Sequence, residues 1–443
     1  MAKGPGRNAL CPCGSGRKYK NCCLPADEAQ ERAARAAAPP LSTVSVWDDL
    51  DDEDEDDALD PLDGVFPLLP PPPDDPHTQA QNALWERFED ADYETQIALF
   101  QEALGGSELD ADLAFEMLTE IQATAQERGE LARVDALLDQ LAREAPGFYE
   151  ADATYYASWR IDNALARGDL ARIPAALEPF AQNPAANLDE LFRVADQLLY
   201  YDQTAPLLDT LRRGWNEMIG AEGIAREQID IYTDLILDLQ VYEYVRTTAE
   251  PRANDPALDR RVAAYLQSEG RIFCVQNTGA LLGTSSREWK PSDFESAPRT
   301  EPRERRLTLL AWAWVGELWR RHGVLLGRTG LAGRALVEYL IEGAAKGKSA
   351  QAMLVPARRR LERYLTDYFD VMDYREYRAG ALIELLPLYL DFLVERGLID
   401  RGVQRHALAD LRPLAEHFLH QLAADRADPA IATAIRARWE ATE

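Results

Sequence analysis

The stretch Arg128-Gly-Glu-Leu-Ala-Arg-Val134 recurs 39 residues later as Arg167-Gly-Asp-Leu-Ala-Arg-Ile173, and this repeat decides the fold prediction. Aligned without gaps, the eighteen residues that begin at each first arginine are identical at eight positions. The glycine of each copy can adopt the left-handed conformation that ends a helix, and the acid after it suits the start of the next helix. Each copy is therefore predicted to be a helix hairpin.

A fainter third copy comes next, in which Leu207-Leu208 and Leu211 echo Leu137-Leu138 and Leu141. A single hairpin cannot bury its own apolar stripe, so repeats of 30 to 40 residues are expected to stack into a solenoid. Residues 84–267 are the predicted solenoid domain, and residues 84–265 loosely resemble tetratricopeptide-type helical repeats. The spacing drifts from 39 to 31, and that family's Trp, Gly, Tyr and Phe signature is not legible. We therefore predict an irregular α-solenoid.

The rest of the 443-residue chain is also predicted to be helical, because apolar residues recur three and four apart and long β-branched runs are scarce. Glycines and prolines interrupt residues 268–306, which are predicted to form an irregular connection that can include a short β element at Arg271 to Val275. Residues 307–443 form a second, C-terminal helical unit. Its expected helices are 357–369, 374–396 and 405–424. The predicted fold class is all-α.

Residues 27–83 are predicted to be a flexible linker. Ten of the thirteen residues from Asp48 to Asp60 are acidic, and Pro70 to Pro73 is an unbroken proline run. Such a composition cannot bury enough apolar surface to offset the entropy of ordering. The linker is expected to be a disordered tether, or alternatively an acidic mimic that folds back on the basic N-terminal segment.

The formal charge of −28 is unevenly distributed. Residues 1–47 carry 7 Lys and Arg against 3 Asp and Glu, and residues 299–443 carry 23 against 20. The middle of the chain therefore has 18 basic and 53 acidic residues. Its body should repel nucleic acid, whereas the N-terminal segment is compatible with a phosphate-bearing partner.

Residues 1–26 contain four of the five cysteines: Cys11, Cys13, Cys22 and Cys23. The chain shows no secretion signal, and adjacent cysteines are poorly placed for a mutual disulfide, so this cluster indicates a metal site. Four thiolates with no open position favour structural Zn²⁺, with iron as the alternative. The fifth cysteine, Cys274, is expected to be a buried apolar residue.

The segment from Pro12 to Lys20, Pro-Cys-Gly-Ser-Gly-Arg-Lys-Tyr-Lys, lies between the cysteines and resembles the SEC-C motif, known from the C-terminal tail of the translocase ATPase SecA. The resemblance covers residues 6–24. It implies zinc bound by the four cysteines, with Cys23 where that tail has histidine, and docking to the chaperone SecB or to ribosomes without catalysis. The implied contact residues are Arg17, Lys18, Tyr19 and Lys20.

No catalytic motif stands out. His417 and His420 do not fit a His-Glu-x-x-His zinc motif and are expected to be surface or core residues. The run Arg358 to Arg363 is interpreted as a solvated helix face, with a phosphate-binding patch as the alternative. The aromatic residues at helical spacing are interpreted as packing. They are Tyr364, Tyr368, Phe369, Tyr374 and Tyr377.

These observations predict a non-catalytic, cytoplasmic adaptor without membrane insertion. Its zinc module would dock to a chaperone, to nascent-chain machinery or to the ribosome, and its solenoid would present a concave surface to a protein or peptide. The alternative is a nucleic-acid-associated factor that contacts phosphates through the basic module. An enzyme within residues 299–443 is a third possibility, one that would require convergent acids in a pocket.

Overall fold

The structure is a computed structural model. It describes residues 75–265, 268–284, 288–295, 303–342, 349–368, 375–424 and 427–442. All regular elements in these ranges are helices, and none of the residues there is in a strand. The predicted all-α fold is confirmed. The predicted zinc module and most of the predicted linker lie outside the described residues.

The first half of the described chain forms short helices joined by tight turns. These are α2 (Pro76–Glu89), α3 (Tyr93–Ala103), α4 (Ala111–Arg128), α5 (Leu131–Glu144), α6 (Pro146–Ala151), α7 (Ala153–Arg167), the 3-10 turn η2 (Leu170–Arg172), α8 (Ile173–Ala176), α9 (Glu178–Gln182), α10 (Leu188–Tyr200), α11 (Thr204–Gly220), α12 (Arg226–Thr247) and α13 (Pro256–Val262).

The second half contains longer helices. These are α14 (Ser268–Leu281), α15 (Ser292–Glu295), α16 (Arg303–His322), α17 (Leu326–Glu342), α18 (Ala350–Leu354), α19 (Arg358–Asp367), α20 (Glu376–Glu395), α21 (Arg401–Ala424) and α22 (Pro429–Glu440). Helices α19, α20 and α21 agree with the predicted ones, and Gly397 after α20 has a positive φ of +67°, which suits glycine at a helix end.

The repeated turn is built as its sequence predicts. Gly129 ends α4 and Gly168 ends α7, each with φ of +70°. In both turns the next amide reaches back to the helix, from Glu130 to the carbonyl of Ala125 at 2.8 Å and from Asp169 to that of Ala164 at the same distance. These bonds satisfy carbonyls that the helix end would otherwise leave free.

The two copies differ after this turn. Helix α5 runs unbroken for 14 residues, whereas the second copy divides into η2, α8 and α9. Pro174 and Pro179 stand where the first copy has Asp135 and Gln140. Proline has no amide hydrogen and is favoured in a first helical turn, and each of these prolines stands in the first turn of a new short helix.

Two expected boundaries differ from those in the structure. Helix α2 begins at Pro76, inside the predicted linker, because Asp75 caps it by accepting from the amides of His77 and Thr78. Helix α16 begins at Arg303, ahead of the expected boundary at 307.

The expected irregular connection with a β element is instead largely helical, since α14 covers residues 268–281. Cys274, Thr278 and Leu281 are all buried, and this spacing of four and three residues is helical. A short apolar run such as this one cannot be assigned to a strand or a helix from its composition alone. The helix therefore replaces both the β element and much of the connection.

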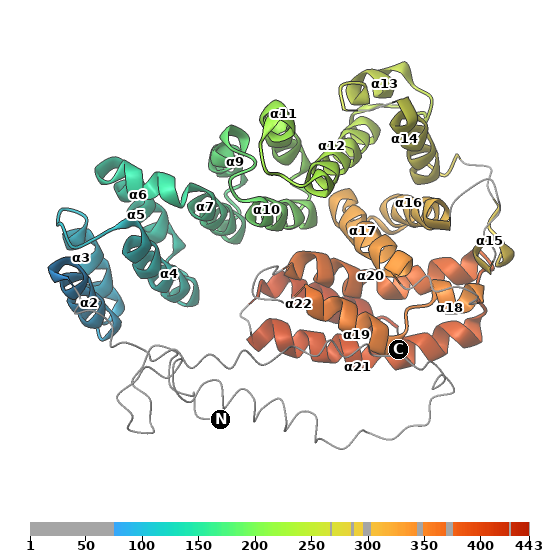
Figure 1. Ribbon diagram of the computed structural model, residues 1–443. Helices are drawn as coiled ribbons and strands as arrows, with labels where there is room; N and C mark the ends of the chain where they lie inside the picture. The colour runs from blue at the N-terminus through green and yellow to red at the C-terminus, as the bar shows by residue number, and fades with distance from the viewer. Residues whose placement is uncertain are drawn as a thin grey trace, which may run out of the picture. The chain divides into compact units, whose positions relative to one another are not determined.

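Neighbouring helices pack in chain order from α2 to α12, as expected of a solenoid, and Figure 1 shows this succession. One apolar core runs from Leu84 to Tyr156, and a second, larger one from Ala157 to Trp439. The second core crosses the predicted connection without interruption. The C-terminal helices therefore share a core with the second half of the solenoid.

Helix α10 is where the C-terminal helices meet the solenoid, because both α17 and α20 pack on it. Glycines permit this approach. A Cβ atom on Gly327 would lie 2.4 Å from the carbonyl oxygen of Leu199, and one on Gly330 would lie 2.0 Å from the Tyr242 hydroxyl. Part of the solenoid's surface at α10 is thus covered by the chain's own helices.

Among the described residues, no helix is long and apolar enough to cross a bilayer.

Candidate interaction face

The residues that the sequence singles out for metal and partner binding all fall outside the described ranges. They are Cys11, Cys13, Cys22 and Cys23, and Arg17, Lys18, Tyr19 and Lys20. Within the described ranges, no group of three or more His, Cys, Asp or Glu side chains is arranged to hold a metal ion.

The other residues that the sequence singles out are structural or exposed. Cys274 is 7% exposed, and burial raises the pKa of its thiol to about 12, which keeps it neutral. The expectation of a buried apolar cysteine is confirmed. His417 and His420 are exposed on α21.

The aromatic residues and the arginine run also divide into buried and exposed side chains. Tyr364, Tyr368 and Tyr377 are buried, as the packing interpretation predicts, while Phe369 and Tyr374 lie outside the described residues. Arginines 358, 359 and 363 are exposed, which agrees with a solvated helix face. The Arg360 guanidinium instead lies 3.9 Å from the ring centroid of Tyr339.

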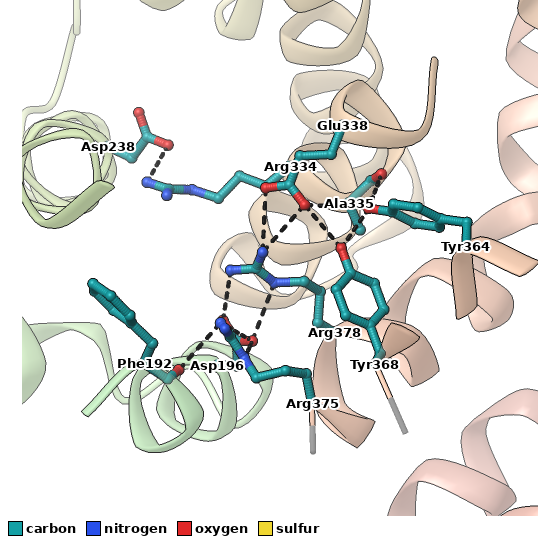
Figure 2. Close-up of polar contacts among 10 residues, drawn as sticks. All are labelled: Phe192, Asp196, Asp238, Arg334, Ala335, Glu338, Tyr364, Tyr368, Arg375 and Arg378. Carbon is teal, nitrogen blue, oxygen red and sulfur yellow. Dashed lines mark hydrogen bonds and ion pairs between the residues drawn. The ribbon is translucent and has the colours of Figure 1, made fainter. Parts of the chain in front are cut away.

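A buried network of ion pairs links α10 to α17, α19 and α20, as Figure 2 shows. Asp196 of α10 lies 2.6 Å from Arg375 and 3.1 Å from Arg378. Arg378 also contacts Glu338 at 3.2 Å, and Glu338 accepts a hydrogen bond from the Tyr368 hydroxyl at 2.8 Å. Two carboxylates thus face two guanidinium groups.

A second ion pair extends this network to α12, where Arg334 of α17 lies 2.6 Å from Asp238. We call the whole network of ion pairs the seam. Burial raises the pKa of Asp238 to about 6, and the nearby Arg334 opposes that shift. Each acid in the seam has a cation or a hydroxyl donor. We interpret the seam as the electrostatic part of the contact between the solenoid and the C-terminal helices.

A different cluster, which we call the acidic cluster, begins at the next residue of α10. The Gln197 side-chain amide donates to Asp162 of α7 at 2.7 Å and to the Tyr377 hydroxyl at 2.9 Å. Tyr377 and Tyr201 both donate to Asp428, which caps α22. The cluster therefore joins α7, α10, α20 and the start of α22.

The acidic cluster holds more acids than cations. Arg193 lies 2.8 Å from Glu190 and 3.8 Å from Asp162. Neither Glu376 nor Asp428 forms an ion pair with any residue that the structure describes. With Glu376 and Asp428 included, the cluster consists of four carboxyl groups and one guanidinium.

Two acceptor atoms in this cluster are buried without a hydrogen bond. They are Oε2 of Glu376 and Oε1 of Gln197, on side chains of residues that are 6% and 2% exposed. Burial raises the pKa of Glu376 to about 7, and burial also raises that of Asp162. The Asp162 side chain is still 33% exposed, so the cluster reaches the surface. Buried acceptors without partners carry a desolvation cost that a donor would remove.

An aromatic patch lies along the same helix as Asp162. Tyr155, Trp159 and Asp162 are spaced by four and three residues, so they share one face of α7. Phe115 of α4 stacks on Trp159 with ring centroids 5.5 Å apart and lies 5.3 Å from the Tyr155 ring. Tyr155 is 39% exposed.

The start of α7 adds a further acid beside this patch. The pKa of Asp152 is raised by burial and by the nearby charge of Asp112. Its side chain does not cap α7, and no hydrogen bond or ion pair joins it to the described residues. The acidic cluster, Tyr155, Trp159, Phe115 and Asp152 together form what we call the α7 face. Such a surface offers aromatic rings and carboxylates, the groups that bind an ammonium or guanidinium.

A family model and a known protein both match the N-terminal segment of the chain. Residues 7–25 match the SEC-C motif family model, so the predicted motif is confirmed. A UPF0225 protein of Serratia proteamaculans (strain 568) is 84% identical over 19 residues, which are 4% of this chain and 12% of that protein. No solved structure matches the chain significantly.

Proposed function

We propose that the protein is a non-catalytic adaptor that combines a zinc module with a helical body for binding a protein partner. The observation that carries the proposal is the match of residues 7–25 to the SEC-C motif, a span that includes Cys11, Cys13, Cys22 and Cys23. A cysteine-only set with intervening glycines suits a closed tetrahedral site. A closed site organises a fold and leaves no open position for a reaction.

The four cysteines would hold Zn²⁺, with iron as the alternative metal. The bound ion would fold the module, because a segment this small has no apolar core of its own. A four-thiolate zinc centre has a formal charge of about −2, which basic residues around it would offset. Arg17, Lys18, Tyr19 and Lys20 would form the docking surface for a chaperone, for nascent-chain machinery or for a ribosomal component. The cysteine-rich site favours a reducing, cytoplasmic environment.

A nucleic-acid-associated function is the second candidate. It is supported by the excess of four positive charges in residues 1–47, against a strongly acidic body. Phosphate contacts release counterions, so this function predicts affinity that falls steeply with salt concentration. Binding of a protein partner through apolar and short polar contacts should depend on salt far less.

The proposal is tested by affinity capture of partners with the intact chain and with the Cys22→Ser/Cys23→Ser variant. We expect the variant to lose bound zinc, measured by mass spectrometry of the metal, and to lose the captured partners. Cys274→Ser is the matched control, because Cys274 is buried in α14 far along the chain and should affect neither readout. Recovery of the same partners by the zinc-free variant would exclude the module as the docking element.

A further inference from the structure

We propose that the α7 face binds a basic segment of the partner protein, and that a lysine or arginine side chain of that segment enters the acidic cluster. This inference rests on the adaptor function proposed above, since it assigns the partner's chemistry and the place where the helical body binds it. It concerns the body alone and does not depend on the zinc module.

The acidic cluster lacks hydrogen-bond donors, as a cation-binding site does before its cation is bound. Two acceptors, on Glu376 and Gln197, are buried and have no donor. Leaving an acceptor unsatisfied in a protein interior carries the full desolvation cost of that group. A guanidinium or ammonium supplies donors only, and an arginine carries five N–H groups. An entering cation would therefore supply the donors that these acceptors lack.

The excess of carboxyl groups over guanidinium groups in the cluster also favours a cation as the ligand. Around Arg193, three carboxyl groups compete for one guanidinium, since Glu190, Asp162 and Glu376 all raise the pKa of Arg193. Asp428 adds a fourth acid, held by two tyrosine hydroxyls. A second positive group would reduce the repulsion among these acids. A metal ion does not fit, because the acids of the described chain are not grouped for metal coordination.

The aromatic patch supplies the rest of a peptide site. Tyr155 stands two helical turns before Asp162 and Trp159 stands one turn before it, so a bound side chain's carbon stem or its neighbours could lie on these rings. Phe115 supports them from α4. Partly exposed tyrosine and tryptophan are the residues most enriched at protein contacts.

The surroundings favour a basic partner over other occupants. Residues 75–168, which include α4 and α7, carry 20 Asp and Glu, 6 Arg and no Lys. This field would attract a basic segment and repel an acidic one. The occupant that we assign is an extended partner segment with alternating apolar and basic residues.

The test uses the full chain and two labelled peptides. One is Gly-Leu-Arg-Leu-Arg-Leu-Gly, and the other has glutamine at both arginine positions. Fluorescence anisotropy at about 0.15 M salt should show the arginine peptide binding at least tenfold more tightly. The double variant Asp162→Asn/Glu376→Gln should lose at least tenfold of that affinity. Glu217→Gln is the matched control, because Glu217 is an exposed acid on α11 outside the cluster and should change affinity less than twofold.

Several outcomes would overturn the inference. Equal binding of the two peptides, or no binding of either, would contradict a cation-binding site in the acidic cluster. An equal loss in the Glu217→Gln control would reduce the effect to general charge attraction. Stronger peptide binding after deletion of residues 1–47 would assign the α7 face to the chain's own basic segment. A dimer that the double variant dissociates, seen by sedimentation, would assign it to a second copy.

Failure of this inference can be told apart from failure of the adaptor function. The Cys22→Ser/Cys23→Ser variant should bind the arginine peptide as the intact chain does, because the peptide does not require the zinc module. Loss of cellular partners with retained peptide binding identifies a role of the module. If the chain still captures its cellular partners but does not distinguish the two peptides, the proposed role of the α7 face is contradicted and the adaptor function is not. Circular dichroism confirms that each variant is folded.

Discussion

The seam and the acidic cluster are built from neighbouring residues yet differ in their charge balance. Asp196 and Arg375 belong to the seam, and the next residues, Gln197 and Glu376, belong to the acidic cluster. In the seam three acids face three guanidinium groups, whereas the acidic cluster leaves two acceptors without donors. Buried acids that are all paired with cations join the helices that carry them. Buried acceptors that have no donor can still bind a donor from another molecule. Substitutions within and beside the two clusters test this contrast.

The largest effect is expected from Asp196→Ala. It removes the carboxylate that Arg375 and Arg378 share, and both arginines are largely buried. Breaking a buried pair by removing one partner costs about 3–5 kcal/mol. Urea unfolding should show a loss of this size. Asp189→Ala is the control, since Asp189 is exposed on the same helix, and a similar loss there would contradict a specific role for the seam.

A loss of about 2–3 kcal/mol is expected from Gly327→Ala. The added Cβ would lie 2.4 Å from the carbonyl oxygen of Leu199, so α17 would have to move away from α10 and loosen the seam. Gly220→Ala is the matched control, because Gly220 ends α11 with no atom within 4 Å of the added carbon. Thermal unfolding of both variants makes the comparison, and equal stability would show that α17 does not depend on this close approach.

The acidic cluster should respond in the opposite sense. Glu376 has a pKa raised to about 7, so its folded form prefers to be protonated and its ionisation opposes folding at higher pH. Stability should therefore fall as the pH rises from about 4.5 to 7. Glu376→Gln should raise the free energy of unfolding by about 2 kcal/mol at pH 8 and by about a quarter of that at pH 5.

Denaturant unfolding at the two pH values measures this effect. The single variant should also weaken binding of the arginine peptide, as expected when a binding group is kept at a cost in stability. A variant that is less stable than the natural chain at pH 8 would show that Glu376 is satisfied in the fold, and the acidic cluster would then resemble the seam.

The contrast between the two clusters could not be predicted from the sequence. Gln197 and Tyr377 are 180 residues apart, and Tyr201 and Asp428 are 227 apart. Local patterns show which residues lie on one face of a helix, but not which helices meet. The stripe of Tyr155, Trp159 and Asp162 was visible at helical spacing. Its importance depends on α20 and α22, which reach the acidic cluster through α10, and no short-range signal specifies that contact.

The fold was predictable where a short motif carries its own conformation. The glycine turns after α4 and α7 are of this kind, since a positive φ suits glycine above other residues. The eight identical positions of the repeat say less about the helices after the turn than two of the differing positions do. Pro174 and Pro179 each stand in the first turn of a short helix of the second copy, where the missing amide hydrogen costs no helix hydrogen bond. The departures from the repeat thus decide whether one long helix or several short ones come after the turn.

The smallest effect is expected from Gly168→Ala, at the turn that ends α7. An alanine at φ of +70° costs about 1 kcal/mol, and no neighbouring atom lies within 4 Å of its Cβ, so the cost comes from the backbone alone. Gly147→Ala is the control, with equal space and no positive φ. Thermal unfolding should separate the two. The affinity for the arginine peptide should change less than twofold, because the hydrogen bond from Gln197 of α10 holds Asp162 in place. A larger change would make the turn part of the binding face.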